Sequence, residues 1–203
     1  MIIKWLSDNY IEILGLITGL LYLYFSIKQN ILMWLFGLLS STIYIYVYFI
    51  SKFYADMGLQ VYYVFISIYG WYYWLYGKRK HNEKDLPVSK ISIKLALILF
   101  FVNLMLFLII SYILKNYTDS SLPYWDAFTT AASIVATWML ARKIIEHWLI
   151  WIVVDSVSFG LYLYKGLYPT VILFSVYTIM AIIGYREWKK EMLVSDKPFS
   201  IVN

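Results

Sequence analysis

A single carboxylate, Asp155, lies in the middle of an apolar stretch that runs from residue 145 to residue 164. A helix of about twenty such residues is long enough to cross a bilayer. A charged acid at its centre costs roughly 2.5–3.5 kcal/mol on insertion scales, so we expect it to have a compensating role. Trp148, Trp151 and Ser158 follow helical spacing with Asp155 and share one face with it. The pattern predicts a polar and aromatic stripe that faces a substrate path.

The composition indicates a membrane protein without catalytic chemistry. The 203 residues are 62% hydrophobic and 14% charged, whereas about a quarter of a soluble domain is charged, so most of the surface must face lipid. The chain has no cysteine and two histidines, too few for a metal cluster. It has no zinc-protease motif, nucleophile elbow or phosphate-binding glycine loop. We therefore predict no enzyme activity, no metal and no cofactor.

Seven apolar segments of about 18–23 residues, separated by short polar breaks, predict the fold. The expected class is an all-α integral membrane protein with seven transmembrane helices in one domain, residues 1–203. The first segment is expected to be retained, because no cleavage pattern of small residues follows it. The segments are Tyr10–Ile27, Ile31–Ser51, Ala55–Tyr76, Ser92–Leu114, Tyr124–Ala141, Ile145–Tyr164 and Leu167–Trp188.

The lysines and arginines predict the orientation of these helices. Thirteen of the seventeen fall on one side of the predicted membrane, and the other side has only Lys4, Lys52, Lys115 and Lys165. Because basic residues are enriched in cytoplasmic loops, the N-terminus is expected outside and the C-terminus in the cytoplasm. The net charge of +5 then reflects this orientation, and we expect no nucleic-acid partner.

The chain also contains an internal repeat. A shift of 114 positions aligns Tyr10–Tyr48 with Tyr124–Tyr162 without a gap, and places Asp155 opposite Ser41. For the third helix, the alignment that drops six residues near Lys52 pairs Ser67 with Ser175 and Tyr69 with Tyr177.

The repeat predicts two three-helix units, residues 9–77 and 124–189, in the same orientation around a linker helix, residues 92–115. This 3+1+3 arrangement with parallel repeats occurs in secondary transporters, which bind substrate near the bilayer midplane. Asp155 would lie about 15 Å into its helix at 1.5 Å per residue, close to that plane.

Residues on the matched stripes and on the third helices are the candidates for substrate contact. A carboxylate between tryptophans suits a flat cation, through charge pairing and cation–π attraction. Two alternatives stay open: Asp155 could be a structural carboxyl bonded to a neighbouring helix, and Trp148 could belong to an interfacial aromatic belt. The candidate substrate-binding residues are Trp151, Asp155, Trp148, Ser158, Trp34, Ser41, Tyr44, Ser67, Trp71 and Tyr177.

Three runs of the sequence resemble the Pnu family of bacterial vitamin transporters, the PnuC type. They are ARKIIEHWLIWIVVD…GLYLYKGLY…AIIGYREWKK (141–190), KFYADMGLQVYYVFISIYGWYYWLYGK (52–78) and YWDAFTTAASIVATWMLARK (124–143). The resemblance implies a SWEET-like fold, a homotrimer in the bacterial inner membrane and facilitated diffusion of an unphosphorylated vitamin precursor that a cytoplasmic kinase then traps. The family's Trp-x-x-x-Asn motif maps onto Trp151 and Asp155, where Asp replaces Asn.

The resulting prediction is a transporter of nicotinamide riboside, with thiamine or riboflavin as alternatives within the family. Two further hypotheses remain at this stage. One makes Asp155 a proton-coupling group in the same carrier, and the other makes the chain a membrane scaffold subunit without substrate.

Overall fold

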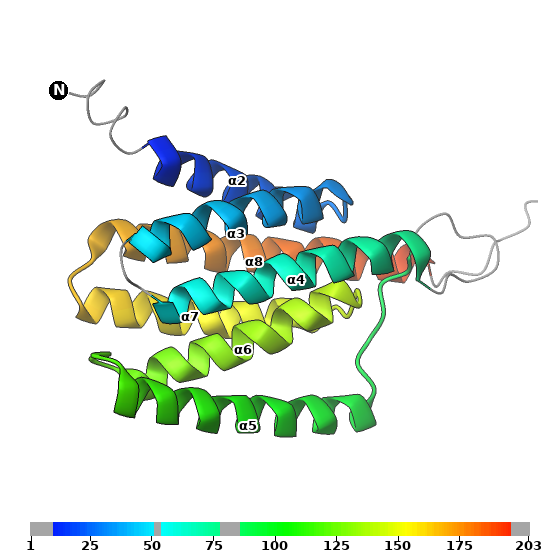
Figure 1. The fold of residues 1–203 in the computed structure, drawn as a ribbon. Helices are drawn as coiled ribbons and strands as arrows, with labels where there is room; N and C mark the ends of the chain where they lie inside the picture. The colour runs from blue at the N-terminus through cyan, green and yellow to red at the C-terminus, as the bar shows by residue number, and fades with distance from the viewer. Residues whose placement is uncertain (1–9, 51–53, 78–85, 196–203) are drawn as a thin grey trace, which may run out of the picture. The chain divides into compact units, whose positions relative to one another are not determined.

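The computed structural model describes residues 10–50, 54–77 and 86–195 as a succession of α-helices (Figure 1). The predicted all-α class is confirmed, and so is the number of seven helices in this part of the chain. The helices are α2 (Tyr10–Ile27), α3 (Leu32–Ile50), α4 (Tyr54–Tyr76), α5 (Ile93–Tyr117), α6 (Pro123–Ala141), α7 (His147–Tyr164) and α8 (Tyr168–Ser195).

The observed helix ends agree with the predicted ones to within a few residues, except at the end of α8. There the helix continues for seven residues beyond Trp188, to Ser195. Trp188 and Met192 lie one turn apart on α8, and both are buried. Their packing stabilises the added turns, although the residues around them are charged.

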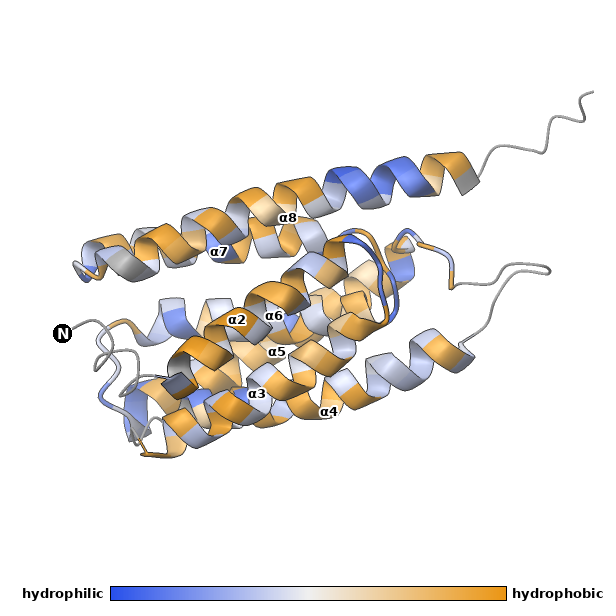
Figure 2. Cartoon of the chain, turned by 90° about the horizontal axis from the view of Figure 1, so that it is seen from above, coloured by the Kyte–Doolittle hydropathy of each residue, from blue (hydrophilic) through white to orange (hydrophobic). Residues whose placement is uncertain are grey.

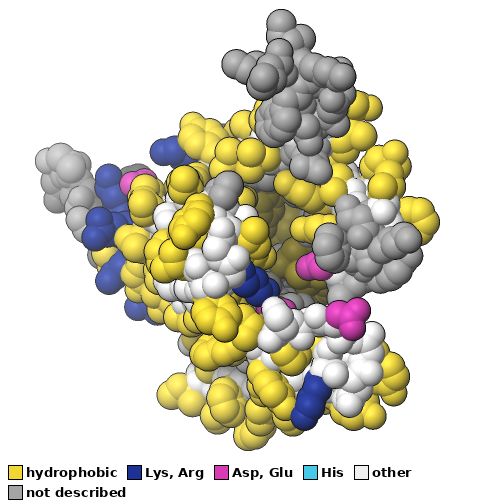
Figure 3. Space-filling view, turned by 90° about the vertical axis from the view of Figure 1, so that its left-hand side faces the viewer, with side chains coloured by type: hydrophobic (Ala, Val, Ile, Leu, Met, Phe, Trp, Pro, Cys, Tyr) yellow, Lys and Arg dark blue, Asp and Glu magenta, His cyan; other side chains and the backbone are white. Residues whose placement is uncertain are grey.

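The helices differ in how apolar they are, and the difference follows their burial in the protein. By length and composition, α3, α5, α7 and the Thr170–Val194 part of α8 could each cross a membrane, and Ile13–Ile27 of α2 is apolar but shorter. The buried residues of α6 include alanines, serine and threonine on all sides of the helix, and a helix enclosed by protein needs no continuous lipid-facing surface. Exposed hydrophobic side chains cover much of the face shown in Figure 3.

The chain divides into two compact units, Met1–Gly77 and Lys78–Asn203. In the first unit α3 packs against both α2 and α4. In the second unit α5 packs on α6, α6 on α7, and α7 on α8. The separation of a linker helix at 92–115 from a three-helix unit at 124–189 stays a prediction.

A short strap, residues 86–91, ties the start of α5 to the corner between α6 and α7. The buried ammonium of Lys143 donates to the Leu86 carbonyl at 2.7 Å. Ser89 N donates to the Lys143 carbonyl, and Ile145 N donates to the Ser89 carbonyl, both at 2.9 Å. The strap is therefore held by backbone pairing and by one buried cation.

The corners between the first two helices of each repeat are built in the same way. Gln29 and Lys143 have φ of 51° and 53°, and they are the only non-glycine residues with positive φ in the described ranges. Each donates its N–H to the carbonyl three residues earlier, at 3.1 and 2.9 Å. The two positions are 114 residues apart, so the repeat found in the sequence extends to an uncommon backbone conformation.

Each repeat also has a tryptophan of its second helix seated on a glycine of its third helix. A Cβ added to Gly70 would lie 2.4 Å from the Trp34 ring, and one added to Gly184 would lie 2.6 Å from the Trp148 ring. Trp34 meets Trp74 edge to face with centroids 5.6 Å apart, and Trp148 meets Trp188 in the same way at 5.8 Å. We call these two contacts the Trp–Gly interlocks.

The interlocks correct the register expected for the third helix. Gly70 and Gly184, like Trp74 and Trp188, are separated by the same 114 residues as Trp34 and Trp148. Helices α4 and α8 also begin 114 residues apart. The alignment that dropped six residues and paired Ser67 with Ser175 is therefore wrong, because packing conserves the tryptophan and glycine contacts rather than the serine and tyrosine identities.

Replacement of Gly184 by alanine tests the interlock. The added methyl group would overlap the buried Trp148 ring, so we expect the variant to lose about 1–3 kcal/mol of stability through overpacking. The matched control is Gly160→Ala on α7, where the new Cβ meets nothing within 4 Å and alanine favours the helix by about 1 kcal/mol. Thermal unfolding in detergent measures both, and equal stability of the two variants would contradict the interlock.

Candidate functional site

The α7 stripe, which we define as Trp148, Trp151, Asp155 and Ser158, lies on the inward side of its helix. Trp148, Asp155 and Ser158 are buried, with 2%, 5% and 7% of their surfaces exposed. Trp151 is half-buried. The helical spacing seen in the sequence therefore corresponds to one inward-facing side of α7, as expected.

Asp155 is a buried acid without a partner in the described residues. Its carboxylate takes part in no hydrogen bond, ion pair or other interaction among them. The alternative of a structural carboxyl bonded to a neighbouring helix thus finds no support in this part of the chain. Because no described residue offsets the cost of burying this acid, Asp155 is a candidate for binding a ligand.

Trp148 has a different environment from Trp151. Its ring is enclosed by Gly184, Trp188 and His147, with centroids 4.6 Å apart for the His147 pair. It is therefore too deeply packed to form an interfacial belt. Trp151, three residues further along α7, keeps part of its surface accessible and is the better placed ring for stacking on a ligand.

His147 completes the aromatic packing beneath Trp148. It is fully buried, and its Nδ1 lies 2.7 Å from the Ile144 carbonyl. That bond makes Nδ1 the donor and leaves Nε2, which has no partner in the described structure, as the unprotonated nitrogen. A neutral imidazole of this kind is a packing element of the corner.

In the first unit, the stripe on α3 has the same burial with different chemistry. Trp34 and Ser41 are 0% and 5% exposed, at the positions equivalent to Trp148 and Asp155. Tyr44 is half-buried, and its ring lies so close to Gly15 that a Cβ added there would be 3.1 Å away. These α3 residues therefore provide the hydroxyl groups of Ser41 and Tyr44 and no charge.

Gly37 takes the position equivalent to Trp151, and the space that a side chain would fill is occupied from other helices. A Cβ there would lie 2.9 Å from the Tyr22 ring and 3.2 Å from the Ser67 hydroxyl oxygen. The sequence places Gly37 on the same stripe of α3 as Trp34 and Ser41, but Tyr22 was not identified from it. The signal that could have pointed to a residue filling this space is the repeat itself, which pairs a tryptophan with a glycine.

The remaining two candidates lie on the third helices. Trp71 on α4 and Tyr177 on α8 are half-buried. Tyr177 meets Phe174 edge to face at 5.8 Å, and Phe174 stacks on Tyr162 of α7. Tyr177 therefore belongs to an aromatic contact between α7 and α8.

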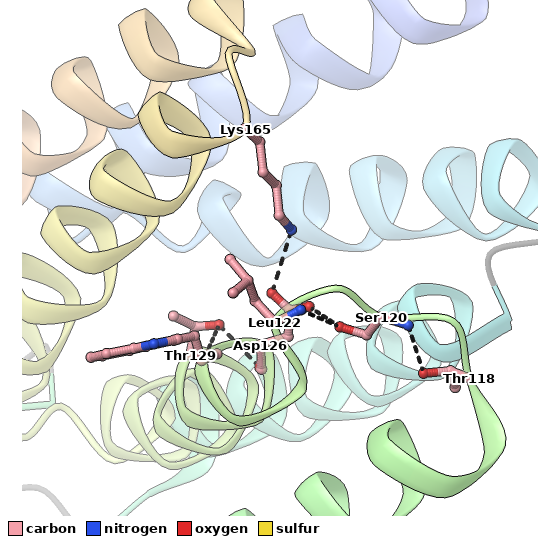
Figure 4. A network of polar contacts seen from close by, with 7 residues as sticks. Thr118, Ser120, Leu122, Asp126, Thr129 and Lys165 are labelled. Atoms are coloured by element: carbon pink, nitrogen blue, oxygen red, sulfur yellow. Dashed lines mark hydrogen bonds and ion pairs between the residues drawn. The ribbon is translucent and has the colours of Figure 1, made fainter.

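A polar network joins the start of α6 to the turn between α7 and α8 (Figure 4). The Ser120 hydroxyl donates to Asp126 Oδ2 at 2.6 Å, and Lys165 Nζ lies 3.8 Å from Asp126 Oδ1. Asp126 is thus a paired carboxylate, in contrast to Asp155. No group of three or more histidine, cysteine or acidic residues that could hold a metal occurs among the residues described.

These features define a multi-pass helical membrane protein built from an internal repeat. Asp155 lies buried in a helix that is long and apolar enough to cross a membrane, and it has no partner among the described residues. The family described as nicotinamide mononucleotide transporter matches residues 9–190, and the chain belongs to this family.

Named relatives give this membership more detail. The chain is 26% identical to the "Nicotinamide riboside transporter PnuC" of Escherichia coli over 89% of its own length and 85% of the relative's. It is 24% identical to the "Riboflavin/roseoflavin transporter RibM" of Streptomyces davaonensis, over 90% and 87% of the two lengths. The crystal structure of the vitamin B3 transporter PnuC superposes with a TM-score of 0.74 at 25% identity, covering 95% of this chain and 86% of that one.

The two carboxylates of the second unit can be told apart by their effect on stability. Asp155→Asn removes an unpaired buried charge, so we expect stability equal to or above that of the wild type. Asp126→Asn weakens a charged hydrogen bond and a half-exposed ion pair, so we expect a loss of about 0.5–1.5 kcal/mol.

Thermal unfolding in the same detergent measures both variants. A marked loss of stability for Asp155→Asn would show that the carboxylate has a structural partner after all.

Proposed function

We propose that this protein is a carrier for an unphosphorylated, cationic vitamin precursor, and that nicotinamide riboside is its substrate. The observation that supports this proposal best is the buried Asp155 carboxylate, 5% exposed and without a partner in the described residues. The pyridinium ring of nicotinamide riboside is a flat cation that would neutralise this charge. The named nicotinamide riboside transporters support the proposal.

The same carboxylate argues against a phosphorylated substrate, although the family description names the mononucleotide. The basic residues of the described helices lie away from the helix centres: Lys94 and Lys115 are at the ends of α5, and Arg186, Lys189 and Lys190 are in the last ten residues of α8. A phosphate near the middle of α7 would therefore meet Asp155 without a compensating cation, and like charges in a low-dielectric site repel strongly. The riboside, which lacks the phosphate, fits this electrostatic environment better.

In the proposed site, Trp151 stacks on the substrate's ring and Asp155 balances its charge. Trp148 positions these two residues through its interlock with Gly184. Ser41 and Ser67 belong to the first unit, and their role in substrate binding stays a prediction from the sequence. The chain would have no catalytic activity, because transport by alternating access between the units 9–77 and 124–189 requires none.

The setting of the carrier is part of the same proposal. Uptake would occur by facilitated diffusion across the bacterial inner membrane, with phosphorylation in the cytoplasm trapping the substrate. The charge distribution supports an external N-terminus and a cytoplasmic C-terminus, although several of the lysines that carry this argument lie outside the described residues. The homotrimer is proposed on the family resemblance.

Thiamine is the second candidate, because its thiazolium ring is also an aromatic cation. Riboflavin is the third, supported by the named riboflavin relative. Riboflavin is neutral and would leave Asp155 without a counter-charge. The positive charge that the buried acid would recognise is therefore present in nicotinamide riboside and thiamine and absent from riboflavin.

Uptake into proteoliposomes tests the substrate and the site together. We expect labelled nicotinamide riboside to be displaced by unlabelled riboside and much less by its neutral dihydro form, which has nearly the same shape. Asp155→Asn should weaken binding of the cation at least about tenfold, equal to 1.4 kcal/mol, and should leave the dihydro form unaffected. Trp151→Ala should weaken both ligands.

The control is Trp125→Ala, which removes a half-exposed tryptophan at the start of α6 and should leave uptake unchanged. Thiamine and riboflavin are added as competitors in the same assay. Stronger displacement by thiamine would replace the riboside as substrate, and unchanged uptake in both site variants would exclude the proposed site. No saturable binding of any of these compounds would favour the scaffold hypothesis.

The unpaired carboxyl of Asp155 also supports a second mechanism, in which it carries a proton together with the substrate. This mechanism requires uptake to respond to an imposed pH gradient and to collapse with a protonophore. For facilitated diffusion we expect neither response in the wild-type protein. If both responses occur and Asp155→Asn abolishes them, proton coupling is the correct mechanism.

A further inference from the structure

The last three turns of α8 present a group of cations on one side of the helix. Arg186, Lys189 and Lys190 are exposed, and together with Leu193 and Val194 they line an open hollow of about 510 Å³. We call these three cations the α8 basic face. In Figure 2 the hydropathy colours of α8 change from mainly apolar to hydrophilic at this point.

The packing of α8 fixes the direction of this face. At 3.6 residues per turn, Arg186, Lys190 and Leu193 share one side of the helix, and Trp188 and Met192 lie on the opposite side. Trp188 is fully buried against His147 and Trp148, with centroids 4.8 and 5.8 Å away. The helix therefore cannot rotate to hide its cations without breaking the interlock.

The charges of the basic face are not neutralised within the described protein. Arg186 and Lys190 have no ion pair there, and Lys189 contacts only the Tyr185 ring, at 5.7 Å. The acids of the same turns, Glu187 and Glu191, fall on a third side of the helix by the same periodicity. The exposed face thus keeps a concentrated positive charge.

An apolar stripe leads along α8 into the basic face. Ile172, Val176, Ile179 and Ile183 follow spacings of three and four residues on the same side of the helix, and all four are exposed. Their exposed fractions run from 39% for Val176 to 66% for Ile172. An apolar stripe that ends in clustered cations is complementary to a phospholipid, in which an apolar acyl chain leads to an anionic phosphate.

We propose that this surface of α8 is a binding site for an anionic phospholipid. The acyl chain lies along the isoleucine stripe, and the headgroup phosphate binds between Arg186, Lys189 and Lys190. Basic residues near a membrane surface attract anionic lipid headgroups. A soluble phosphate would meet the cations but not the stripe, so the lipid is the occupant that accounts for both.

The site would link the lipid to the transport helix. Trp188 follows Arg186 by two residues and packs on Trp148, and Trp148 lies on the helix that carries Asp155. Bound lipid would therefore stabilise the end of α8 and, through the interlock, the position of α7. The inference concerns lipid binding and stands whether or not the proposed vitamin substrate is correct.

The test measures the rise in melting temperature when the protein is moved from nanodiscs of phosphatidylcholine to nanodiscs of phosphatidylglycerol. The site variant is Arg186→Gln with Lys189→Gln and Lys190→Gln. The matched control is Lys28→Gln with Lys90→Gln and Lys94→Gln, which removes three exposed charges elsewhere in the chain.

We expect the wild type and the control to show the same rise in melting temperature, and the site variant to lose most of this rise. The rise should also shrink with added salt, because exposed charges are screened. A second variant, Lys189→Arg with Lys190→Arg, keeps the charge and should keep the rise, which separates lipid binding from damage to the helix.

Three results would overturn the proposal. The site variant could retain the full rise, or the control could lose as much as the site variant, which would indicate a general charge effect. Inorganic phosphate or glycerol phosphate added in phosphatidylcholine nanodiscs could also reproduce the rise, and the ligand would then be a soluble phosphate.

Discussion

The contact on which the other features depend is a tryptophan ring seated directly on a glycine of the next helix. Trp34 lies on Gly70 and Trp148 lies on Gly184, and in each case a second tryptophan closes the contact edge to face. A large rigid ring against a bare backbone allows little sliding or rotation. Each contact therefore fixes how far the second helix of its unit is advanced along the third, and hence the depth of every side chain on that second helix.

Although both units share this contact, they carry different side chains at the equivalent positions around it. Two turns after the interlocked tryptophan, one unit has Ser41 and the other has Asp155, and both are buried. One turn earlier, Gly37 is covered by Tyr22 in one unit, while Trp151 keeps part of its surface accessible in the other. The repeat is thus conserved where it packs and differs where a ligand could bind, which accounts for a single charged position in a nearly symmetric pattern.

The helices could be predicted from the sequence because length and apolarity are local properties, and their observed ends lie close to the expected ones. The register of the third helices was missed because Ser67 and Tyr69 find identical residues, Ser175 and Tyr177, at a shift of 108 positions. Gly70 and Trp74, which fix the shift of 114, are significant only once their contacts with Trp34 are known. The spacing on α7 indicated which residues share a side. It could not reveal that Trp148 is enclosed while Trp151 is accessible, because this depends on α8.

The strap at residues 86–91 has a consequence for the order in which the protein assembles during synthesis. Its bonds to Lys143 and Glu146 join residues 54 to 57 positions apart, whereas the backbone bonds that close the Gln29 corner join near neighbours. The first corner can form as soon as α3 leaves the ribosome. The start of α5 must wait in the membrane until α6 and the beginning of α7 have been made, so the final attachment of α5 is a late step in biogenesis.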